Sequence, residues 1–135
     1  MYDARSRYVA DSVATASPAR LLTMLYDRLL LDLDRAAGAF AAGDDAAPFV
    51  DHAQDVVSEL MATLDVDAWG GADHLMSIYG FVLTELLHAD ESRVAGCRLL
   101  LEPLAVAWHE AAAALGGPPP APAGAPLAAG VLGVG

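Results

Sequence analysis

The sequence predicts an all-α protein, an antiparallel four-helix bundle with a short N-terminal segment and a disordered C-terminal tail. Three observations lead to this prediction. Apolar residues recur at steps of three and four through most of the 135-residue chain, which is typical of amphipathic helices. No stretch combines a sustained period of two with the β-branched residues of a strand. The connections between the helical stretches are short, which favours antiparallel neighbours.

The clearest helix is expected over residues 17–40. Ser17 can cap its first turn with a hydroxyl, and Pro18 suits the first helical position, where no backbone N–H is needed. Gly43 is expected to stop this helix. The predicted apolar face consists of Leu22, Leu25, Leu29, Leu33, Ala36 and Phe40. The opposite, polar face is expected to carry Arg28, Asp32 and Arg35.

A second helix is expected after Gly43, with Asp44 and Asp45 as candidate caps and Pro48 in its first turn. Its predicted apolar stripe is Phe49, Ala53, Val56, Leu60 and Leu64, with Val57 and Met61 beside it. Its polar residues should face away from the bundle.

Gly70 and Gly71 then break the chain, and two more helices are expected, from about Asp73 to Ala89 and from about Glu91 to Leu115. Pro103 lacks a backbone N–H, so the last helix should kink or restart there. The apolar face predicted for this helix is Val94, Cys97, Leu101, Leu104, Trp108, Ala111 and Leu115.

Composition limits the classes of function. Residues 36–92 contain 11 acidic residues and no Lys or Arg, so this block repels phosphate and argues against binding to nucleic acid or anionic membranes. The single Cys97 cannot form an intramolecular disulfide and is expected to be buried in a reducing compartment. We expect neither a signal peptide nor insertion into a membrane, and therefore a cytosolic protein.

The candidate chemistry is sparse. Glu85 and His88 have the Glu-x-x-His spacing of carboxylate-bridged di-metal bundles, but such a site needs two pairs and the chain has one. We therefore expect a solvated pair. No glycine-rich phosphate loop, nucleophile elbow or cysteine–histidine metal spacing occurs. The sequence favours a binding protein without a metal or cofactor over an enzyme.

The third predicted helix has more apolar residues than one core-facing stripe requires. Nine of the thirteen residues at 75–87 are apolar, whereas a core-facing helix needs about three in seven. One stripe is Leu75, Ile78 or Tyr79, Val82 and Leu86, and a second is Met76, Leu83 and Leu87. Either one stripe faces the core and the other forms an open docking groove, or the helix is enclosed by its neighbours and the tail.

Several motifs together resemble one family. The stretch SPARLLTMLYD, at residues 17–27, is similar to the first-helix signature of FliS, the flagellin-specific export chaperone. The other motifs follow in the family's order. They are Tyr8, Val56 to Leu60 with Leu64 and Asp65, Gly70 and Gly71 with Leu75, Ile78 with Tyr79, Leu86 with Ala89 and Asp90, and Trp108. The resemblance covers about residues 1–115.

The resemblance implies a cytosolic, non-enzymatic chaperone that binds the disordered C-terminal segment of flagellin. It would prevent premature polymerisation and help to deliver flagellin to a component of the flagellar export gate. It also implies an N-terminal flap at residues 1–16 over a bundle domain at 17–115. The family's compact members have no counterpart to residues 116–135, and the uncharged, Pro/Gly/Ala-rich composition of this segment predicts a disordered tail. The candidate partner-binding residues are Tyr8, Met24, Val57, Leu60, Leu64, Leu75, Met76, Ile78, Tyr79, Val82, Leu83 and Leu86. The alternatives are a helical adaptor with another protein client and a di-metal bundle enzyme.

Overall fold

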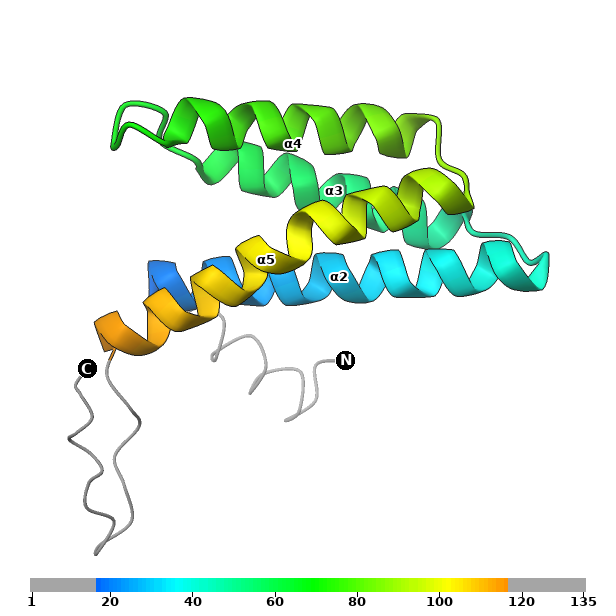
Figure 1. Cartoon of the computed structure of the whole chain (residues 1–135), viewed down its shortest axis with the longest axis horizontal. Coiled ribbons are helices and arrows are strands. Elements are labelled where there is room, and N and C mark those ends of the chain that lie inside the picture. The colour runs from blue at the N-terminus through cyan, green and yellow to red at the C-terminus, as the bar shows by residue number, and fades with distance from the viewer. Residues whose placement is uncertain (1–16, 117–135) are drawn as a thin grey trace, which may run out of the picture. The chain divides into compact units, whose positions relative to one another are not determined.

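The computed structural model describes residues 17–116, and the regular structure in this range is helical throughout. Its helices are α2 (Pro18–Ala42), α3 (Ala47–Thr63), α4 (Ala72–Leu87) and α5 (Glu91–Gly116), shown in Figure 1. The predicted all-α class is therefore confirmed. The predicted flap at residues 1–16 and the predicted tail beyond residue 116 lie outside the described residues.

The described residues belong to two compact units. The larger unit is Leu25–Leu104, and the smaller includes residues 17–24 and 105–116. Within the larger unit, consecutive helices run in opposite directions along the chain (Figure 1), as predicted for an antiparallel bundle. Side-chain hydrogen bonds tie its helices together. Tyr26 on α2 bonds to Tyr79 on α4, and Gln54 on α3 donates to the Leu86 carbonyl on α4.

Local signals in the sequence explain where the helices start. The Ser17 hydroxyl accepts a hydrogen bond from the Arg20 backbone N–H at 3.2 Å, and α2 begins at Pro18 as predicted. The Asp45 carboxylate accepts a hydrogen bond from the Ala47 N–H at 3.0 Å, at the first residue of α3. These side chains satisfy amides that have no carbonyl partner within their own helix.

Gly43 ends α2 in the way the sequence predicts. It has a φ of 75°, a left-handed conformation that costs a glycine little because it has no Cβ. The Gly43 N–H donates to the Phe40 carbonyl at 3.2 Å, and the Asp44 N–H donates to the Ala39 carbonyl at 2.8 Å. This pair of bonds is a Schellman motif, which satisfies carbonyls in the last turn.

The core of the larger unit takes one face from each helix. Its most deeply buried large apolar side chains are Tyr26, Leu29, Leu33, Val57, Leu60, Tyr79, Val82, Leu86, Val94, Cys97 and Leu101. Burying a side chain the size of leucine contributes about 1.5–3 kcal/mol, so these residues carry much of the stability of the unit. Cys97 is a free, buried thiol, as predicted.

The predicted apolar face of α5 is buried in the first half of the helix and exposed near its end. Val94, Cys97 and Leu101 are buried, whereas Ala111 is exposed and Leu115 is 80% exposed. A periodic pattern fixes which residues share a face, but it does not fix how far along a helix packing partners extend. Of the kink or restart predicted at Pro103, the restart does not occur, because α5 continues through this residue.

Asp32 does not lie at the solvent-exposed surface that the sequence predicts for it. The sequence pattern places it on the polar face of α2, but its side chain is only 1% exposed. The carboxylate hydrogen-bonds to Nδ1 of His52 on α3, and it lies 3.4 Å from Nε of Arg28. The predicted ion pair with Arg28 is therefore present, but on a buried carboxylate. The partner on α3 makes this burial possible, since buried charges need partners.

Candidate partner-binding surface

One of the two apolar stripes on α4 faces the core. Of the two alternatives in the first predicted stripe, Tyr79 is buried and Ile78 is half-buried. The other buried members are Leu75, Val82 and Leu86. The hydroxyls of Tyr79 and Tyr26 are 2.7 Å apart, and their rings are tilted by 55°. Burial is the main cause that raises the pKa of the Tyr79 phenol above its usual value, and the hydrogen bond to Tyr26 adds to this shift. The phenol therefore stays neutral.

The second stripe of α4 reaches the surface of the larger unit. Met76 and Leu83 are half-buried, and Leu87 is 64% exposed. Gly80 lies between them at helical spacing, and a Cβ placed on it would meet no atom within 4 Å beyond its chain neighbours and the nearby α4 backbone. We call Met76, Gly80, Leu83 and Leu87 the α4 stripe. Within residues 25–104, α4 is thus not enclosed on this side, and its surface is both apolar and open at the glycine.

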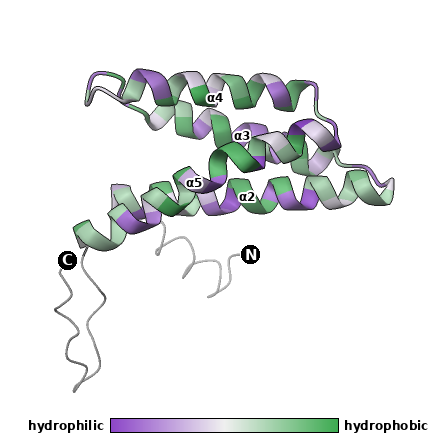
Figure 2. Cartoon of the chain, viewed as in Figure 1, coloured by the Kyte–Doolittle hydropathy of each residue, from purple (hydrophilic) through white to green (hydrophobic). Residues whose placement is uncertain are grey.

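Figure 2 shows hydrophobic residues on α4 interspersed with hydrophilic ones along its length. Phe81 is also exposed, at 54%, and it lies on a different face of the helix from the α4 stripe. An apolar residue that is exposed singly is common on protein surfaces, whereas a row at steps of three and four presents a continuous strip. The α4 stripe is therefore the stronger candidate for contact with another protein.

The structure separates the twelve predicted binding residues into three groups. Six are buried in the core of the larger unit: Val57, Leu60, Leu75, Tyr79, Val82 and Leu86. Five are half-buried: Met24, Leu64, Met76, Ile78 and Leu83. Tyr8 lies outside the described residues. The half-buried group retains surface that a partner can reach in this conformation. A binding role for each of the twelve stays a prediction.

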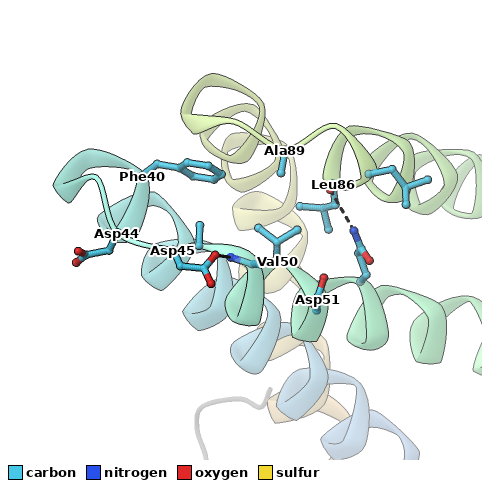
Figure 3. Close-up of a pocket in the computed structure, with 11 residues that line it drawn as sticks. Phe40, Asp44, Asp45, Val50, Asp51, Leu86 and Ala89 are labelled. Atoms are coloured by element: carbon cyan, nitrogen blue, oxygen red, sulfur yellow. Dashed lines mark hydrogen bonds between the residues drawn. The ribbon is translucent and has the colours of Figure 1, made fainter.

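Sequence reasoning missed two features of this surface. Gly80 was not included among the binding residues, although a glycine, which has no Cβ, lets another backbone approach closely. A pocket where α2, α3 and α4 meet was also missed, because its residues come from three separate segments. It has a volume of about 420 Å³, and Figure 3 shows Phe40, Val50 and Leu86 among its lining residues.

The candidate metal pair has other partners in the structure. Glu85 lies 3.7 Å from Nε of Arg93, and the His88 ring lies 3.2 Å from the Thr84 carbonyl oxygen. Among residues 17–116, no group of three His, Cys, Asp or Glu side chains has the geometry to hold a metal ion. In the same part of the chain, no helix is long and apolar enough to cross a bilayer.

Comparison with known protein families gives one match that spans most of the chain. The family described as flagellar protein FliS matches residues 1–115, a range that contains α2, α3, α4 and nearly all of α5. The match agrees with the resemblance seen in the motifs. A search of curated proteins finds no match.

Proposed function

The chain belongs to the FliS family of flagellar proteins, and from this membership we propose that it binds the disordered C-terminal region of flagellin. The family is one of flagellar chaperones and not of enzymes. In this proposal the protein acts in the cytosol, prevents premature polymerisation of flagellin and assists its delivery to the flagellar export apparatus. Its partners are flagellin and a component of the export gate.

The observation that supports the proposal is the apolar α4 stripe. A disordered client that folds into an amphipathic helix needs an apolar strip on which to bury its own apolar face. Met76 offers a flexible side chain that adapts to different partners, and Gly80 allows a client backbone to approach α4 closely. The uncharged stripe suits such a helix, whereas the 11 acidic residues at 36–92 disfavour nucleic acid as a partner.

Calorimetry tests the proposed client with the full-length chain and the C-terminal segment of flagellin. Burial of apolar surface, coupled to folding of the client, should give one-to-one binding with a negative heat-capacity change. Absence of binding to flagellin, together with capture of a different client, would instead support the alternative of a general helical adaptor.

Substitutions test whether the client uses the α4 stripe. Leu83→Glu should weaken binding at least tenfold, because it places a charge where apolar surface must be buried. Ser77→Glu is the matched control, since it adds the same charge at an exposed position of α4 and should leave affinity unchanged. Thermal melts of both variants separate loss of fold from loss of binding. If Leu83→Glu remains folded and binds normally, the client binds elsewhere.

A further inference from the structure

The pocket where α2, α3 and α4 meet combines apolar walls with acidic side chains. Val50 is 7% exposed and Leu86 is 1% exposed, so both form a fixed apolar floor. Phe40, from the last turns of α2, is half-buried and lines the same pocket. Figure 3 shows its ring turned toward Ala89, in the connection between α4 and α5. We call this site the junction pocket.

Three carboxylates line the junction pocket: Asp44, Asp45 and Asp51. Asp45 has a structural role, because it accepts the Ala47 N–H. In Figure 3, Asp51 extends from α3 toward the side on which Leu86 lies. None of the three forms an ion pair with a cation from residues 17–116. The pocket therefore carries negative charge that this part of the chain does not neutralise.

The surrounding chain adds to the negative potential. Residues 36–92 contain no Lys or Arg, and the next cation, Arg93, lies near Glu85 and Asp90. The C-terminal ends of α2 and α4 also lie at the pocket, and helix C-termini carry partial negative charge. The N-terminus of α3 has the opposite sign, but the Asp45 carboxylate already accepts its first N–H, that of Ala47. A positively charged ligand is therefore favoured.

We propose that the junction pocket binds an arginine side chain of a partner protein, presented between apolar residues. Arginine fits both properties of the site. Its aliphatic stem can pack on the apolar floor while its charged end stays near the carboxylates at the rim. Guanidinium is more weakly hydrated than ammonium, stacks on aromatic rings and pairs with carboxylates through two hydrogen bonds. Phe40 supplies the ring and Asp51 the accessible carboxylate.

This site is distinct from the proposed client surface in its chemistry. The α4 stripe is uncharged, whereas the junction pocket depends on carboxylates from α3 and from the connection before it. Leu87 borders both sites, so the variants that test the pocket leave α4 unchanged. The two proposals can therefore fail independently.

The test uses NMR spectra of the full-length, 15N-labelled protein and the peptide acetyl-Ala-Leu-Arg-Leu-Ala-amide. A second peptide carries citrulline, which has nearly the shape of arginine without its charge. The arginine peptide should shift the amide signals of Phe40, Val50 and Leu86. The citrulline peptide should bind about fivefold more weakly, as expected for loss of a partly exposed charge pair. A lysine peptide should fall between them.

Asp51→Asn is the informative variant, and it should weaken the arginine peptide about fivefold. Asp55→Asn is its matched control, because it removes the same charge from an exposed position on α3 that does not line the pocket. Three results would overturn the proposal. The first is that millimolar arginine peptide shifts no signal at the pocket, and the second is that the citrulline peptide binds as tightly as the arginine peptide. The third is that Asp51→Asn and Asp55→Asn weaken the arginine peptide equally, which would indicate attraction to the net charge of the protein alone.

Discussion

Asp32 offers the sharpest test of the packing between α2 and α3. Its carboxylate is 1% exposed and is held by His52 from α3 and by Arg28 one turn earlier on α2. Asp32→Ala removes the acceptor and leaves both partners without it. This change should lower the free energy of unfolding, even though the sequence pattern places Asp32 on the solvent-facing side of α2.

The size of the loss follows from the exposure of the partners. Truncating one member of a fully buried ion pair costs about 3–5 kcal/mol, because the other charge stays buried. The side chains of His52 and Arg28 are 44% and 48% exposed, so water can solvate them after the change. We therefore expect the smaller cost of losing hydrogen bonds to charged groups, about 2 kcal/mol. Asp32→Asn keeps one acceptor oxygen and should cost about 1 kcal/mol.

Urea unfolding followed by circular dichroism measures these free energies. A loss of about 2 kcal/mol corresponds to a fall in melting temperature on the order of 10 °C for a domain of this size. Asp34→Ala is the matched control, because Asp34 is 51% exposed and pairs with Arg98 at the surface. That change should cost less than about 1 kcal/mol. If Asp32→Ala costs no more than Asp34→Ala, Asp32 faces solvent and the packing described here is refuted.

Two further predictions concern the core. A double-mutant cycle of Tyr26→Phe and Tyr79→Phe should give a coupling energy of about 1 kcal/mol, since the hydroxyls are 2.7 Å apart, and strictly additive losses would contradict this bond. Burial, with a smaller contribution from the charge of Glu85, raises the pKa of the Cys97 thiol to about 11. In the unfolded chain the thiol has a pKa of about 8.5, so it loses its proton at a lower pH than in the folded protein. The free energy of unfolding, measured by urea titration relative to Cys97→Ala, should therefore fall as the pH rises from about 9 to about 11. A difference that does not change with pH would argue against burial.

The boundaries of α2 could be predicted because each depends on a local signal. Ser17 and Pro18 mark the start of α2, and Gly43 marks its end, within a few residues of the atoms that they satisfy. The burial of Asp32 could not be predicted in this way. Its partner, His52, is 20 residues away on another helix, and helical periodicity describes one helix at a time.

Helical periodicity also could not predict which of the two apolar stripes of α4 is open to a partner. Both stripes have helical spacing and apolar residues, so the sequence alone left open whether one of them reaches the surface. In the structure, the stripe of Leu75, Tyr79, Val82 and Leu86 faces the core, and Leu87 of the other stripe lies at the surface. The apolar excess on this helix was visible in the sequence, but its direction is a property of the neighbouring helices.

Acidic residues near the start of a helix can either bond to its first amides or line a binding site, and the junction pocket contains residues of both kinds. In the sequence, Asp44 and Asp45 read as caps, and Asp45 does bond to the first amide of α3. The same residues line a pocket only because α4 returns past the start of α3 and places Leu86 beside Val50. The hydrogen bond from the Ala47 N–H already accounts for an acidic side chain at Asp45 without a ligand. Asp51 is past the first turn and caps nothing, so its carboxylate is the one whose role at the pocket a single substitution can isolate.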